Sequence, residues 1–331
     1  MRAFALGALL LIAGAAAAHH SRSHYSRETR EIEGELVAVH WVNPHVGVTL
    51  KVRGAAGDEE LWRVEGVPSL VTMQRVGLAG DRLTIGERIT AVGSVSLRRD
   101  RDFLATNFLL EDGTELVLDA DAGPYGSGPY IGNLGPAPAA RVDTAAENRG
   151  IFRVWSPPAD GAGQREDFPY TAAAIAARAA WDPVDNFAER CEPEGMPRIM
   201  RNPHPFQFVD RGTEIAIVSE LYDLVRVVHM DRDAPPPDAP ATPLGYSVGR
   251  WHGRTLAVTT TQVSWPYFDN IGTPQSADVR MEEAFTLSED QARLDYRLVI
   301  ADAATFERPA VYERHWLALG AAIAPYNCQV Y

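Results

Sequence analysis

Three titratable side chains in the second half of the chain could carry out proton transfer. Glu283, His229 and His315 each lie in an alternating stretch and share the parity of its apolar residues. Because successive side chains of a β-strand point to opposite faces, this parity predicts that all three point into one apolar interior. If Glu283 acts as the base and His229 or His315 as the acid, the protein would be a cofactor-free lyase, isomerase or hydratase. The alternative is that they are hydrogen-bonded core or rim residues, since a single β-bulge reverses strand parity.

A candidate metal site lies at the start of the chain. Residues 1–18 carry one arginine, an apolar run and a small-residue end, which is typical of a secretory signal peptide. Cleavage after residue 18 would leave His19 as the first residue, so that its amine and ring nitrogen can chelate a metal, with His20 next to it. His45 can supply a further nitrogen, and nitrogen-rich planar sites favour copper. The alternatives are an uncleaved membrane anchor and a solvated tail that binds nothing.

Composition and charge argue against nucleic acid and the membrane interior as partners. The chain has 331 residues, and Asp and Glu (44) outnumber Lys and Arg (31), for a formal net charge of −13. Nucleic acid is therefore not an expected partner, because phosphate recognition needs a basic face. No later segment is long and apolar enough to span a membrane, so we expect a periplasmic or secreted protein without stable membrane insertion. In that oxidising compartment the two cysteines, Cys191 and Cys328, can pair, with two separate thiols as the alternative.

The polar candidates must be positioned by two β-rich domains. In residues 19–118, alternating segments and one short helix predict a small Greek-key barrel of the oligonucleotide/oligosaccharide-binding (OB) type, with a sandwich as the alternative. Residues 119–150 are rich in Gly, Pro and Ala and predict a linker. Residues 151–331 predict a helix that begins at Thr171 and then a closed antiparallel, lipocalin-like barrel that can hold one small molecule. The expected strands cover 31–41, 46–52, 61–64, 89–95, 103–110 and 116–118, then 206–209, 213–222, 225–230, 247–251, 255–262, 279–287, 293–300 and 310–319.

One tripeptide occurs in both halves of the chain. Asn43-Pro44-His45 recurs as Asn202-Pro203-His204. Asn-Pro is a turn former, so we interpret both copies as turns that start a strand.

Several motifs resemble those of a family of exported bacterial proteins of unknown function. His19-His20-Ser21 and residues 39–45 resemble the family's His-His-Ser start and its Trp-x-Asn-Pro-His strand. Residues 191–198, 245–251 and 255–258 resemble a partner domain found in similar exported proteins. The resemblance implies pairing of Cys191 with Cys328 and a special role for the histidines His19, His20 and His45, but no activity. His252 and Arg254 depart from the family's pattern, which usually has an acidic residue after the tryptophan.

The sequence therefore predicts an exported, mainly β protein with two domains. Its expected ligands are a metal, with copper favoured, and a small apolar or aromatic molecule inside the second barrel. The alternatives are the acid/base enzyme described above and a structural module of the cell envelope. A hollow second barrel would favour the ligand or enzyme hypotheses over the structural one.

Overall fold

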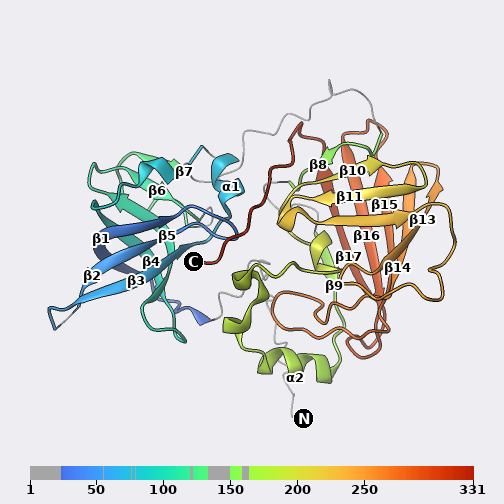
Figure 1. Cartoon of the computed structure of the whole chain (residues 1–331), viewed down its shortest axis with the longest axis horizontal. Helices are drawn as coiled ribbons and strands as arrows, with labels where there is room; N and C mark the ends of the chain where they lie inside the picture. The colour runs from blue at the N-terminus through green and yellow to red at the C-terminus, as the bar shows by residue number, and fades with distance from the viewer. Residues whose placement is uncertain are drawn as a thin grey trace, which may run out of the picture.

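The computed structural model shows two β-sheet domains side by side (Figure 1). It describes residues 24–54, 56–75, 77–78, 80–119, 122–132, 150–158 and 164–331. The expected signal peptide, His19 and His20 lie outside these residues. Within the described ranges, no helix is both long and apolar enough to cross a membrane.

In the part of the chain that the structure describes, the first sheet has seven strands and the second has ten. The first contains β1 (Arg30–His40), β2 (Gly47–Arg53), β3 (Glu59–Gly66), β4 (Arg88–Val95), β5 (Asp102–Leu110), β6 (Glu115–Val117) and β7 (Tyr130–Gly132). The second contains β8 (Val154–Trp155), β9 (Arg165–Asp167), β10 (Phe206–Asp210), β11 (Glu214–Ser219), β12 (Val225–His229), β13 (Tyr246–His252), β14 (Thr255–Thr261), β15 (Arg280–Leu287), β16 (Arg293–Ala301) and β17 (Ala310–Leu317). The α-helices are α1 (Leu70–Arg75) and α2 (Ala172–Ala180), and the 3-10 turns are η2 (Gly80–Arg82), η3 (Pro183–Asp185), η4 (Phe187–Arg190), η5 (Arg198–Met200) and η6 (Leu221–Asp223).

The first domain is a closed five-stranded barrel, as expected for an OB-like fold. Its strands run in the order β3-β2-β1-β4-β5, and parallel pairing of β3 with β5 closes the ring. The long strand β1 pairs with both β2 and β4, and a register shift between Leu36 and Ala38 allows it to bend between them. Leu36, Val48, Leu50 and Phe108 are fully buried in the barrel core.

The first sheet extends into the segment expected to be a linker. Strand β7 pairs in parallel with β6, and Glu115 accepts hydrogen bonds from the backbone N–H groups of Tyr125 (2.6 Å) and Gly126 (2.8 Å). The buried side chain of Asn107 donates to the same carboxylate at 2.5 Å and to the carbonyl of Gly123 at 2.8 Å. These hydrogen bonds fix the start of a Gly/Pro-rich segment against the first domain. Composition alone does not reveal this attachment, because the segment has little apolar content.

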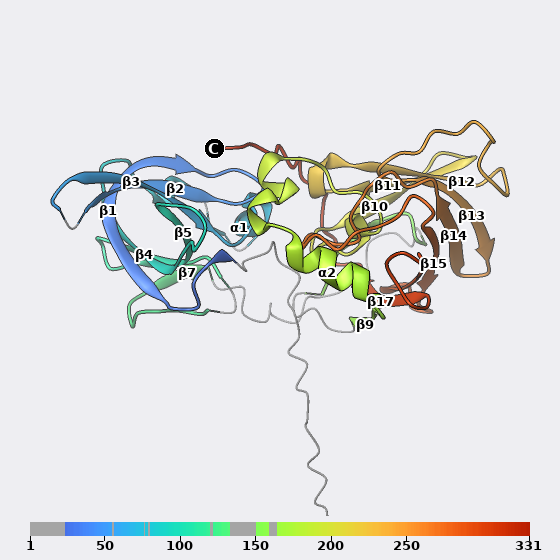
Figure 2. The same cartoon turned by 90° about the horizontal axis from the view of Figure 1, so that it is seen from below.

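The second sheet is curled into a half-barrel rather than the closed lipocalin-like barrel that we expected (Figure 2). Its neighbouring strands are antiparallel except for a short parallel pairing of β12 with β13. Among the described residues, Ser156 and Leu317 bridge the two sides of the curl by exchanging backbone hydrogen bonds of 3.0 and 2.8 Å. Helix α2 begins as expected, because the Thr171 hydroxyl caps it by accepting from the N–H of Ala174.

Candidate functional site

Glu283 lies inside the half-barrel, in a buried hydrogen-bond network. Arg226 donates to both of its carboxylate oxygens, through Nη1 to Oε1 at 2.9 Å and through Nη2 to Oε2. The Tyr296 hydroxyl also donates to Oε1 at 2.8 Å, and Arg226 donates to Ser247 Oγ at 3.1 Å. Burial, reinforced by the Glu283 carboxylate, raises the pKa of Tyr296 well above its usual range, so that it stays a donor. Because Arg226 occupies both oxygens, the geometry favours a structural role for Glu283 over that of a base.

His229 and His315 do not join Glu283, so the prediction of a shared interior is wrong for these two histidines. Both are half-buried on the outer face of the sheet. The inward positions of their strands are held by Arg226 and Arg314, which are 3% and 4% exposed. Parity gave the wrong face because both strands carry large apolar side chains on both faces. In addition, the carboxylate that pairs with Arg226, Glu283, is distant in sequence, so nothing local indicates that Arg226 is buried.

Large side chains fill the half-barrel. Phe208, Phe285, Tyr296, Tyr312 and Trp316 are all at most 2% exposed, and several of their rings pack edge-to-face or tilted against one another. A cavity beside this cluster has a volume of about 10 Å³, and it is lined by Ile199, Met200, Asn202, His204, Phe206, Ile217, Ser219, Leu224, Arg226, Leu244 and Trp316. That volume suits about one water molecule. The cavity therefore gives no support to a small apolar ligand inside the second domain.

A larger space lies between the two domains. This groove has a volume of about 460 Å³ and is lined by Arg63, Arg99, Asp100, Arg101, Asp102, Val184, Glu189, Arg190, Val330 and Tyr331. The first domain supplies one wall, from β3 and the turn that joins β4 to β5. The second domain supplies the opposite wall, from η3 and η4. The C-terminal residues Val330 and Tyr331 line the groove on the side of the first domain, where the Tyr331 ring packs on His40 and Arg63. A volume of this size lies within the range of small-molecule sites.

Three of the four arginines in the groove are paired with carboxylates. Arg63 Nη2 donates to Glu65 at 2.7 Å, and Arg99 Nη1 donates to Glu189 at 2.6 Å across the domain boundary. Arg190 makes two bonds of 3.0 Å to Glu192. Arg101 is exposed and has no ion pair within the described part of the chain, and its φ of 53° lies in the left-handed region. Left-handed backbone at a non-glycine residue is strained, and such strain is concentrated at functional sites.

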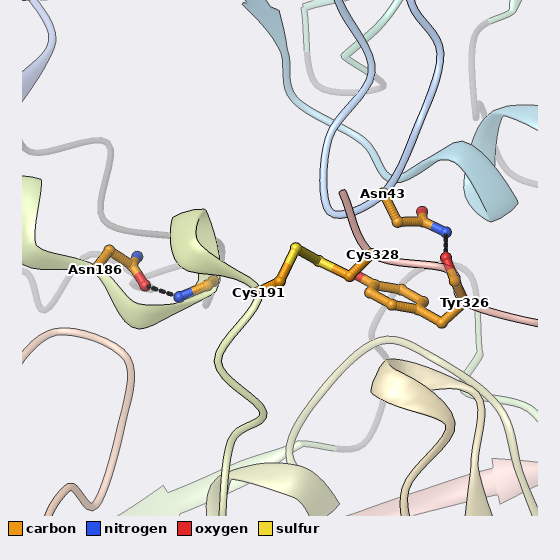
Figure 3. Close-up of a disulfide and its surroundings, with 6 residues drawn as sticks. Asn43, Asn186, Cys191, Tyr326 and Cys328 are labelled. Carbon is orange, nitrogen blue, oxygen red and sulfur yellow. Dashed lines mark hydrogen bonds between the residues drawn. A yellow bond between two sulfur atoms is a disulfide. The ribbon is translucent and has the colours of Figure 1, made fainter. Parts of the chain in front are cut away.

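The Cys191–Cys328 disulfide is present, as expected (Figure 3). The two Cα atoms are 5.7 Å apart, and 137 positions separate the cysteines in the sequence. The bond joins the segment after η4 to residues 324–331, which we call the strap. The strap leaves the second domain and crosses to the first (Figure 1). A disulfide of this kind is compatible with an exported protein.

Both Asn-Pro-His turns hold the strap. In the first domain, Asn43 donates through Nδ2 to the carbonyl of Tyr326 (Figure 3), and its own carbonyl accepts from the N–H of Gln329 at 2.7 Å. In the second domain, the ring of His204 packs edge-on against Tyr326, and its Nδ1 lies 3.2 Å from Glu220. The interpretation of these tripeptides as simple turns was therefore incomplete. The recurrence of the tripeptide was a sequence signal for a shared role. The role itself could not be predicted, because the strap that both turns contact is distant from them in sequence.

His45 is a buried histidine paired with a buried carboxylate. Its Nδ1 contacts Glu65 Oε1, and the two residues are 8% and 6% exposed. A ring nitrogen bonded to a carboxylate is the arrangement that usually orients a metal-ligating histidine. Among the described residues, however, no group of three potential ligand side chains is placed to hold a metal. The other expected ligands, His19 and His20, lie outside those residues.

Comparison with known proteins gives a family without an assigned activity. Residues 8–102 match the model of a family described as a family of unknown function (DUF6152). No curated protein and no solved structure matches the chain. The matched range contains the His-His-Ser and Trp-x-Asn-Pro-His motifs, and it agrees with the resemblance to an uncharacterised family. Over most of its first domain the chain is thus similar to DUF6152, a family of unknown function.

Proposed function

We propose that this protein is an exported, periplasmic binding protein that holds a small organic anion in the groove between its two domains. The observation that carries the proposal is a groove of about 460 Å³ whose lining includes Arg101, an exposed arginine without an ion pair in the described part of the chain. The signal-like residues 1–18 and the disulfide support the location.

One cationic group in the groove is free to bind an anion. Arg63, Arg99 and Arg190 are paired with Glu65, Glu189 and Glu192, whereas Arg101 is exposed and has no ion pair within the described ranges. The proposal of an anionic ligand therefore rests on Arg101 and not on the net charge of the lining. A guanidinium binds a carboxylate through two parallel hydrogen bonds, which makes a carboxylate a suitable anionic group.

The rest of the lining favours a ligand with an apolar part. Val184, Val330 and Tyr331 present apolar or aromatic surface beside the arginines. The Tyr331 ring is fixed in place, because it stacks on His40 at 4.3 Å between ring centres and lies 5.2 Å from the Arg63 guanidinium. We therefore expect a small aromatic or aliphatic monocarboxylate. From the sequence we expected an apolar or aromatic ligand inside the second domain, and we now propose the groove as its site.

Calorimetric titration with benzoate tests this proposal, with inorganic phosphate and acetate as comparison probes. We expect saturable binding of benzoate that is stronger than binding of acetate. The variant Arg101→Gln should weaken it about 10- to 100-fold, since a hydrogen bond to a charged group contributes about 1.5–3 kcal/mol. Arg53→Gln, an exposed arginine of the same domain outside the groove, is the matched control. Absence of benzoate binding, or equal affinity in the two variants, would contradict the proposal.

A copper site that includes His45 is a second candidate. The buried pair of His45 with Glu65 favours it, and His19 and His20 would supply the remaining nitrogens. Titration of the exported, processed protein with Cu(II) tests this candidate. His45→Ala should abolish tight binding, whereas the exposed control His252→Ala should preserve it. Equal binding by both variants removes His45 from the site.

A further inference from the structure

We propose that the Cys191–Cys328 disulfide is a reducible latch on the groove, which opens when a dithiol reductant cleaves it. The consequence for ligand binding rests on the proposed function. The movement of the strap does not, because it follows from the contacts of the strap itself.

The two cysteines belong to opposite walls of the groove. Cys191 comes directly after η4, whose last residues Glu189 and Arg190 line the groove. Cys328 lies two residues before Val330, which together with Tyr331 lines the other side. The bond therefore fixes the position of four lining side chains relative to one another. Cleavage removes this covalent link, and the side that can then move is the strap, because Arg99 still holds Glu189 and Val184 of the other wall to the first domain.

Without the disulfide, the end of the strap is held by one described backbone hydrogen bond and by the packing of one ring. Beyond Cys328, the N–H of Gln329 donates to the carbonyl of Asn43, and the Tyr331 ring packs on His40 and Arg63. Before Cys328, the strap is better held. There the N–H of Ala324 donates to Glu220 at 3.1 Å, and the N–H of Tyr326 donates to Asp223 at 3.0 Å. Reduction should therefore release the end of the strap, which lines the groove, more than its start.

We expect a small dithiol to reach the bond, because both cysteines are half-buried, with Cys328 at the edge of the second domain's core. In the exchange, a thiolate of the dithiol attacks one sulfur and the Cys191–Cys328 bond breaks. The second thiol then resolves the mixed disulfide. The dithiol loses two electrons and two protons and becomes a disulfide, and both cysteines become thiols.

Hydrogen exchange measured by mass spectrometry tests the latch without any ligand. The oxidised full chain, the chain reduced with dithiothreitol, and the variant Cys328→Ser are compared at residues 327–331 and at the buried strand β15. We expect at least tenfold faster exchange of residues 327–331 in the reduced chain and in the variant, with β15 unchanged. Cys328→Ser without reductant shows that the effect does not come from dithiothreitol.

Benzoate titration of the same samples gives the second readout. We expect its affinity to fall at least tenfold on reduction. Unchanged exchange of the strap, faster exchange of strap and β15 together, or an open strap with undiminished benzoate affinity would each overturn the latch. If the strap opens on reduction but the oxidised chain binds no benzoate, the proposed function fails, whereas the redox-controlled strap stands.

Discussion

Replacement of Glu283 by glutamine should destabilise the protein strongly, although the side chain keeps its shape. Glu283 and Arg226 are each 3% exposed, and Arg226 donates to both carboxylate oxygens. The amide of glutamine carries no charge and has a single acceptor oxygen. The variant therefore leaves the guanidinium of Arg226 buried without its counter-charge.

The size of the effect follows from the burial of the pair. Removal of one partner from a buried ion pair costs about 3–5 kcal/mol, because the remaining charge stays away from water. Glutamine can still accept one hydrogen bond, so we expect a loss of about 3 kcal/mol in the free energy of unfolding. The double variant Arg226→Met/Glu283→Leu removes both charges and should lose much less, since apolar replacement of a whole buried pair is often neutral or stabilising.

Urea unfolding under non-reducing conditions, followed by tryptophan fluorescence, measures these differences. The matched control is Glu282→Gln, the neighbouring residue of β15, which is paired with Arg280 at 3.3 Å on the exposed face. A surface pair contributes at most about 1 kcal/mol, so this control should change little. Equal losses of unfolding free energy in Glu283→Gln and Glu282→Gln would refute the inference that Glu283→Gln leaves a buried, uncompensated charge on Arg226. Wild-type stability in Glu283→Gln would do the same.

Three further predictions concern the disulfide, pH and a close backbone approach. The double variant Cys191→Ser/Cys328→Ser should lose up to about 5 kcal/mol of unfolding free energy, because the bond closes a loop that spans 137 positions, and a loss below about 1 kcal/mol in denaturant unfolding would contradict this. Burial, and then the charge of a neighbouring arginine, lowers the pKa of His40, so stability should fall as pH drops below the unfolded value of about 6.5. His40→Gln should flatten that decline in melting curves recorded between pH 7 and 5, and an unchanged slope would exclude His40 as its source. Gly272→Ala should destabilise by about 1–3 kcal/mol, because its φ is +80° and the added Cβ would lie 2.1 Å from a tryptophan ring. Gly212→Ala, with a similar φ of +79° but open space around it, should lose less in the same thermal assay.

The positions of the strands could be predicted because their signal is local. Alternation within a few residues marks each main strand of both sheets, and Thr171 marks the start of α2. The short strands β7, β8 and β9 were missed, since two or three residues carry no periodicity. The face of a strand was harder to predict. It was correct for Glu283, whose apolar neighbours are clearly alternating, and wrong for His229 and His315, whose strands are apolar on both sides.

The candidate groove was not predictable from the sequence. Its lining comes from β3, from the turn that joins β4 to β5, from η3 and η4, and from the strap, which are separated by up to hundreds of residues. The arginines concerned stand in ordinary polar segments, and no motif surrounds them. Arg101 became a candidate only when its exposure, its left-handed backbone and its place in the groove were seen together.

The sequence by itself determined a mainly β protein with an OB-like first barrel, a signal-like start, a negative net charge and a single pair of cysteines. These follow from periodicity, composition and counting, which need no knowledge of long-range contacts. Tertiary structure alone decided that the second sheet is a filled half-barrel, that Arg226 rather than a histidine faces Glu283, and that the strap joins the two Asn-Pro-His turns. The physical reason is that packing volume and ion pairing are properties of strands brought together from distant parts of the chain, whereas alternation is a property of each strand alone.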